Sequence, residues 1–217
     1  MSVNMILLIS IGAVSYFSFS NRALFAKLLF SPYKIDQSKE WYRFLTSAWV
    51  HADFNHLFLN LFVLWGFGGF VEGVFVAWYG PLGSAYYLSL FVGSTLIAHL
   101  PGYLKNTDNY AYSAVGASGG VSGVLFASIM IQPLENLCLY FVLCLPSVIF
   151  GVLYLGYSQY MNRTGNDNIG HEAHIWGALG GVILIIAFRP SVVSNFIYQV
   201  TEAVTSFIYQ VTEVLPF

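Results

Sequence analysis

Three short polar motifs interrupt an otherwise apolar sequence, and their residue types could together perform nucleophilic catalysis. They are HADFNHLFLN at 51–60, GASGGVSG at 116–123 and HEAHIWGALGG at 171–181. A serine hydroxyl becomes a nucleophile when a base takes its proton, and Ser118 and His174 are the candidates for these roles. His56, Asn60 and the backbone amides near Ser118 could stabilise the developing oxyanion. No acidic residue falls inside the apolar segments to orient the histidine, so we expect a Ser-His dyad.

Composition indicates that these motifs belong to a polytopic membrane protein. Hydrophobic residues make up 57% of the 217 residues and charged residues only 8%, whereas soluble domains carry about 25% charged residues. The net charge of −2 gives no basic surface for nucleic acid. Apolar stretches long enough to cross a bilayer predict six helical spans, at roughly 4–22, 53–71, 82–101, 114–131, 137–160 and 172–188.

The order of these spans predicts that the three motifs meet. Spans two, four and six cross the membrane in the same direction, so their starts lie at the same depth near one face. His56 and Asn60 are four residues apart and therefore share a helix face. Ser118 opens the fourth span, where the helix N-terminus favours negative charge. Polar residues inside spans are costly, which makes this convergence a candidate site.

Each motif also has a purely structural interpretation. Gly119, Gly123 and Ala127 form a small-residue pattern that is typical of close helix packing. The pair of His56 and Asn60 could join two helices, and His174 alone could be a bonded core histidine; only their combination at one depth favours catalysis. His51 and His99 are interpreted as interface or loop residues. His171 and His174 are three residues apart instead of the four of a zinc-protease helix, so no metal site is expected.

From Trp41 to Arg189 the sequence resembles the rhomboid family of intramembrane serine proteases. The resemblance lies in WYRFLTSAWVHADFNHLFLN, in GASG at the head of the fourth span and in AHIWGALGG in the sixth. It implies an all-α, rhomboid-like bundle of six transmembrane helices. It also implies that Ser118 is the nucleophile and His174 the base, that His56 and Asn60 flank the oxyanion, and that Arg43 braces the first loop.

The resemblance further implies an endopeptidase that cuts transmembrane segments of other membrane proteins without cofactor or metal. Its partners would be those substrates and the lipid bilayer. The family places the catalytic face away from the cytoplasm, in the inner or plasma membrane. The positive-inside rule predicts the opposite orientation, with the first loop in the cytoplasm, because this loop contains five basic residues: Arg22, Lys27, Lys34, Lys39 and Arg43. We nevertheless expect the family's orientation, because this loop is predicted to lie in the membrane interface.

Two alternatives remain open at this point. Gly120–Gly123 is a second G-x-S-G that overlaps the first, so Ser122 competes with Ser118 as nucleophile, and GASG followed by a glycine four positions later favours Ser118. The second alternative is a catalytically silent relative that binds membrane-protein clients, against which the intact set of four site residues argues. A transporter would show inverted repeats and interrupted spans, which the sequence lacks.

The flanking segments carry no expected chemistry. Residues 1–189 are predicted to form the catalytic membrane domain, opened by a first membrane helix that lacks the basic start of a signal peptide. Residues 190–217 contain an eleven-residue repeat and are predicted to form an interfacial amphipathic helix. Residues 22–50 are predicted to be a structured interfacial loop. Cys138 and Cys144, placed six residues apart on a predicted helix, would face different directions and remain free thiols.

Overall fold

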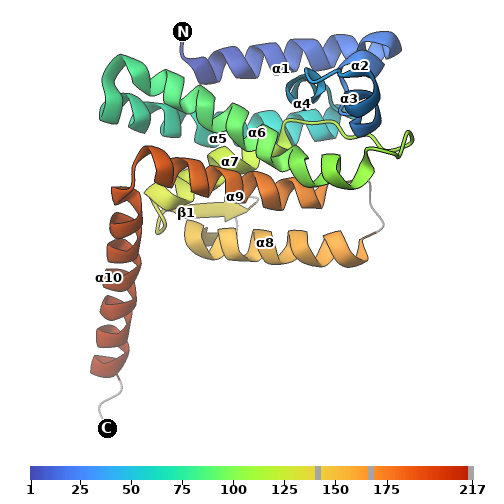
Figure 1. The fold of residues 1–217 in the computed structure, drawn as a ribbon. Helices are drawn as coiled ribbons and strands as arrows, with labels where there is room; N and C mark the ends of the chain where they lie inside the picture. The colour runs from blue at the N-terminus through green and yellow to red at the C-terminus, as the bar shows by residue number, and fades with distance from the viewer. Residues whose placement is uncertain (140–142, 166–168, 215–217) are drawn as a thin grey trace.

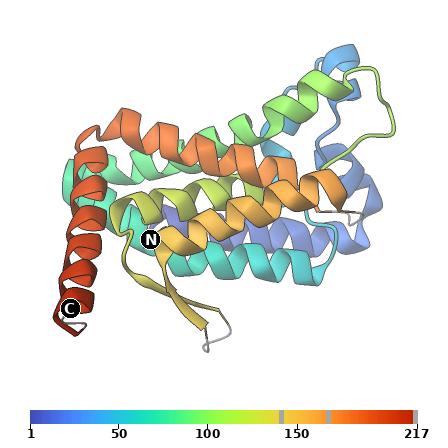
Figure 2. The ribbon, with the colours of Figure 1, turned by 90° about the horizontal axis from the view of Figure 1, so that it is seen from below.

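The long helices of the bundle run side by side with α7 at their centre, and the last helix, α10, runs crosswise to them (Figures 1 and 2). The computed structural model describes residues 1–139, 143–165 and 169–214. Its helices are α1 (Val3–Ser20), α2 (Arg22–Leu28), α3 (Pro32–Ser38), α4 (Arg43–Thr46), η1 (Ser47–Trp49), α5 (Phe54–Tyr79), η2 (Gly80–Leu82), α6 (Gly83–Asn106), α7 (Ser118–Ile131), α8 (Ser147–Thr164), α9 (His171–Phe188) and α10 (Ser191–Val214).

The central helix α7 is enclosed by its neighbours. Every residue from Gly119 to Ile129 is buried, and α7 packs against α5, α6, α8 and α9. Its first turns consist of glycine, serine and valine, which allow other helices to approach the backbone closely. The polar start of this helix is therefore held between elements that are distant in sequence.

Three helical stretches within the described residues are long and apolar enough to cross a membrane. They are Val3–Ser20, Phe54–Asn106, which contains α5 and α6, and His171–Phe188; α7 is apolar but shorter. Helices occupy all six predicted positions, with corrected bounds. That all six cross the bilayer stays a prediction.

The predicted end of the second span at residue 71 is wrong, because Glu72 does not lie in solvent. The α5 helix continues to Tyr79, and Glu72 is only 4% exposed. Its carboxylate accepts hydrogen bonds from the backbone N–H groups of Val3 (2.8 Å) and Asn4 (2.9 Å) and from the Ser84 hydroxyl (2.7 Å). The first N–H groups of a helix lack intrahelical partners, so this buried acid caps α1 instead of ending α5.

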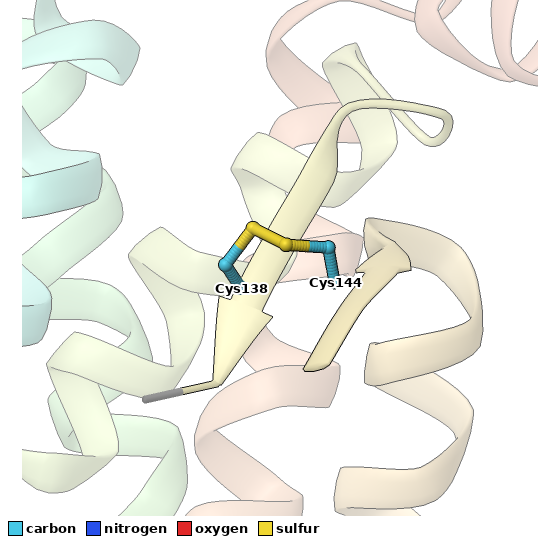
Figure 3. The surroundings of a disulfide bond; sticks show 2 residues. All are labelled: Cys138 and Cys144. Atoms are coloured by element: carbon cyan, nitrogen blue, oxygen red, sulfur yellow. A yellow bond between two sulfur atoms is a disulfide. The ribbon is translucent and has the colours of Figure 1, made fainter. Parts of the chain in front are cut away.

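The predicted start of the fifth span at residue 137 and the predicted free thiols are also wrong. Strands β1 (Asn136–Leu139) and β2 (Leu143–Pro146) form an antiparallel pair in which Cys138 lies opposite Cys144. The two cysteines form a disulfide, shown in Figure 3. Proline lacks the N–H that a helix interior requires, and α8 begins only after Pro146. An apolar strand pair was mistaken for the first turns of a helix.

The C-terminal segment forms the helix α10, which leaves the end of the bundle after Arg189 and Pro190. It extends away from the other helices in Figures 1 and 2. Only its first part contacts the bundle, where the Gln199 amide donates to the Ile131 carbonyl at 3.2 Å. Its place in the membrane interface and the division of the chain at residue 189 stay predictions.

Candidate functional site

The starts of α7 and α9 meet through their backbones. A Cβ atom placed on Gly177 would lie 2.2 Å from the Gly119 carbonyl oxygen, and one placed on Gly119 would lie 3.9 Å from the Ala173 oxygen. Such contact is feasible only between residues without side chains. Ser118 precedes Gly119 and His174 follows Ala173, so each candidate catalytic residue is directly beside this crossing.

The two candidate serines differ in their surroundings. Ser118 is the first residue of α7 and is half-buried. Ser122 lies one turn further into the bundle, is 3% exposed, and its hydroxyl is 2.8 Å from the Tyr154 hydroxyl. A substrate carbonyl can approach a half-buried helix start more readily than an enclosed side chain, so the geometry favours Ser118.

A tyrosine that sequence reasoning missed contacts His174. The Tyr154 ring, from α8, stacks on the His174 imidazole with centroids 6.1 Å apart and an angle of 20° between the rings. His171, the first residue of α9, has its ring 5.8 Å from that of His174. Tyr154 carried no signal in the sequence, because one aromatic among many in an apolar helix is unremarkable until its neighbours are known.

His56 lies against the turn that precedes α7. Gly116 has a φ of +114°, which residues with side chains rarely adopt. A Cβ on Gly116 would lie 2.6 Å from His56 Cε1, so the imidazole occupies the space that a side chain would need. The structure thereby brings His56 within two residues of Ser118.

Asn60 lies one turn along α5 from His56 and is 6% exposed. Its Nδ2 donates to the His56 carbonyl at 2.9 Å, a contact within its own helix. His56 and Asn60 therefore share one face of α5, as predicted from their spacing, and His56 is the member of the pair that touches the turn before Ser118.

His51 lies in the loop between η1 and α5, as interpreted, but it is also part of the site's framework. It is fully buried, its Nε2 accepts from the Ala117 N–H at 3.1 Å, and its Nδ1 lies 2.8 Å from Ser15 Oγ. Ser15 in turn donates to the Trp49 carbonyl at 2.9 Å. These directions assign the proton to Nδ1. His51 thus fixes the residue immediately before Ser118 to α1, a role that only the folded chain reveals.

Acid is expected to weaken the fold through His51. Burial lowers the pKa of His51 from 6.5 to about 3, and the neighbouring His56 acts in the same direction. Below pH 6.5 the unfolded chain therefore binds a proton that the folded chain excludes. This contribution to the free energy of unfolding falls by about 1.4 kcal/mol for each pH unit between those two values.

The measurement is the free energy of unfolding of wild type and His51→Gln in detergent at pH 7 and pH 5. Glutamine does not titrate, so the stability advantage of the wild type should shrink by about 2 kcal/mol on acidification. Every other titrating group is common to both proteins and cancels in the comparison. Parallel pH dependences would contradict the prediction.

The expected bracing role of Arg43 is confirmed by its contacts. Arg43 is 2% exposed, and its Nη1 donates to the carbonyls of Ala26 (3.0 Å) and Leu29 (2.8 Å). Glu40 pairs with the same guanidinium, and this hydrogen bond lowers the pKa of Glu40. The contacts of Arg43 confirm the prediction that the first loop is structured. The interpretation of His99 as an interface or loop residue is wrong, because His99 is buried within α6 and its Nε2 lies 2.9 Å from Ser47 Oγ.

The arrangement suits nucleophilic attack on a carbonyl. A hydroxyl lies at a helix start, where the first N–H groups lack intrahelical acceptors and point outward. An imidazole lies on the adjoining helix start, and a second imidazole, His56, faces the preceding turn. Among the described residues, no three His, Cys, Asp or Glu side chains gather as metal ligands.

Comparisons with known proteins identify the family. A model of the rhomboid domain matches residues 38–191. Rhomboid-like protein 11, chloroplastic, of Arabidopsis thaliana is 34% identical over 163 residues, which cover 67% of this chain and 51% of that protein. The putative rhomboid protease YdcA of Bacillus subtilis is 28% identical over 148 residues, 67% of this chain and 66% of that protein.

The rhomboid protease GlpG of Haemophilus influenzae is 27% identical over 157 residues, 72% of this chain and 74% of that protein. The chain thus spans about half the length of the plant relative and more of the bacterial ones. The resemblance expected from the motifs is confirmed. Because the domain match runs from the first loop to the start of α10, this protein belongs to the rhomboid family, a family of membrane proteins that includes intramembrane serine proteases.

Proposed function

We propose that this protein is an intramembrane serine endopeptidase in which Ser118 and His174 form the catalytic dyad. The observation that carries the proposal is the backbone contact between the starts of α7 and α9, one residue from each member of the dyad. The protease names of two bacterial relatives support it. The hydrogen bond that the buried Ser122 hydroxyl shares with Tyr154 supports the choice of Ser118 over Ser122.

The reaction follows from these positions. Ser118 Oγ attacks the substrate carbonyl while His174 takes its proton, and the oxyanion forms beside the first N–H groups of α7, with His56 and Asn60 at its flank. Collapse breaks the peptide C–N bond, and His174 gives its proton to the leaving amine. Water, deprotonated by His174, then hydrolyses the ester and regenerates Ser118.

The length of α7 supports membrane-embedded substrates. Its 14 residues extend about 21 Å, whereas the hydrocarbon core of a bilayer is about 30 Å thick. A helix of this length that ends near one surface begins below the other, which supports a position of Ser118 within the bilayer. A substrate helix must unwind there, because its amides are otherwise shielded by their own hydrogen bonds. Substrates are accordingly membrane proteins whose transmembrane segments unwind easily.

The orientation and the membrane are part of the same proposal: the protein lies in the inner or plasma membrane of the cell, and its catalytic face points away from the cytoplasm. The basic residues on this face do not all act as free charges. Arg43 is buried on backbone carbonyls, and Lys39 and Lys105 pair with Asp36 and Glu172. Paired charges are weaker topology signals than free ones, which reduces the conflict with the positive-inside rule.

Labelling with a serine-reactive fluorophosphonate tests the proposal. Purified wild type should label, Ser118→Ala should not, and Ser122→Ala should still label at a reduced rate. Right-side-out vesicles treated with a membrane-impermeant probe should label only if the site faces away from the cytoplasm. A folded wild type that never labels would contradict the proposal and favour the silent, client-binding alternative.

A further inference from the structure

One side chain on α8 connects the two helices that carry the dyad. Tyr154 shares a hydrogen bond with Ser122 of α7, with 2.8 Å between the hydroxyl oxygens. The same tyrosine stacks on His174 of α9, nearly parallel at 6.1 Å. Figure 2 shows α8 alongside α7 and α9, where such a bridge is possible.

Resting on the proposed function, we propose that Tyr154 is a positioning residue: it holds the His174 imidazole in its catalytic orientation and is itself held by Ser122. A histidine base acts only when one ring nitrogen points at the nucleophile, and its ring turns about a broad terminal torsion. A flat ring stacked on the imidazole restricts that rotation. Tyr154 takes no part in the proposed bond-forming and proton-transfer steps, so it acts through the His174 ring on which it stacks.

The tyrosine is fixed on its other sides as well. Phe150 and Phe126 have their rings 6.2 Å and 5.9 Å from that of Tyr154. Ser122 is 3% exposed, so water does not compete freely for its hydroxyl. Packing against Phe150 and Phe126 therefore sets the position of the Tyr154 ring, and the hydrogen bond with Ser122 sets the distance of its hydroxyl from α7.

This bridge gives the second G-x-S-G a role. Ser118 and Ser122 are four residues apart and thus share a face of α7. Ser118 is the nucleophile, and Ser122 holds Tyr154, which in turn supports the base, His174. Their fixed separation along one helix couples the position of His174 to that of Ser118.

The test is the kinetics of fluorophosphonate inactivation of the purified full chain, separated into kinact and KI. Tyr154→Leu should lower kinact by about tenfold or more, since misorientation of a catalytic group costs that much, with KI changed less than about twofold. Tyr154→Phe keeps the ring and should retain most of the rate, losing about threefold. Ser122→Ala should match Tyr154→Phe, and the double variant should be no slower than either.

Tyr160→Leu is the matched control, because Tyr160 is on the same helix and 64% exposed. Thermal unfolding of each variant identifies losses of kinact that are caused by misfolding. Tyr154→Phe and Ser122→Ala each remove a single hydroxyl oxygen, so both variants should remain folded. Equal kinact for Tyr154→Leu and Tyr160→Leu would overturn this inference alone, provided that Ser118→Ala abolishes labelling. Failure of the wild type to label would overturn the proposed function, and this inference with it.

Discussion

Replacing His174 with asparagine is expected to slow peptide-bond cleavage by at least about 10³-fold, because the proton of Ser118 then has no acceptor. His174 is half-buried at the start of α9, so a smaller polar side chain should leave the bundle folded. The measurement is cleavage of a single-span reporter in proteoliposomes. The reporter's transmembrane segment should contain glycine and serine at its centre, so that it unwinds easily.

His171→Asn is the matched comparison for this prediction. It changes the same residue type on the same helix, one turn earlier, at a position that is 5% exposed. Its ring packs against those of Tyr157 and His174, so a loss of less than about tenfold is expected from altered packing. A larger loss in His171→Asn than in His174→Asn would mean that the base has been assigned to the wrong histidine.

Gly177→Val is expected to prevent stable folding, and Gly177→Ala to lower the free energy of unfolding by about 2–3 kcal/mol. A Cβ at this position would lie 2.2 Å from the Gly119 oxygen and 2.8 Å from its Cα. These are backbone atoms of a buried helix and cannot turn away, so α7 and α9 must separate. Separation also moves His174 away from Ser118, and labelling by a fluorophosphonate should fall even where Gly177→Ala still folds.

Gly156→Ala is the control for the glycine substitution. A Cβ on Gly156, in the exposed part of α8, would meet nothing within 4 Å, and alanine is the better helix former by about 1 kcal/mol. This variant should be as stable as the wild type or more stable, and equally active. Equal stability of Gly177→Ala and Gly156→Ala in thermal and denaturant unfolding would contradict the close crossing of α7 and α9.

The class of protein, the family and the approximate positions of the long helices could be predicted from the sequence alone. Long apolar runs have few stable solutions other than helices in a bilayer, so composition and spacing were sufficient for these conclusions. That the starts of the fourth and sixth spans lie together was also predicted, because helices that cross in the same direction place their starts at one depth. Small-residue patterns then marked where the backbones approach.

Which polar groups support one another becomes visible only in the packed fold. Glu72 looked like the end of a span, and in the fold it caps α1. Cys138 and Cys144 looked divergent on a helix, and strand pairing sets them opposite each other. His51 and Tyr154 had no distinguishing spacing, and they acquire roles from partners 66 and 32 residues away in sequence. Local periodicity reports which face of an element is apolar, whereas the partner of a buried polar group depends on which elements pack together.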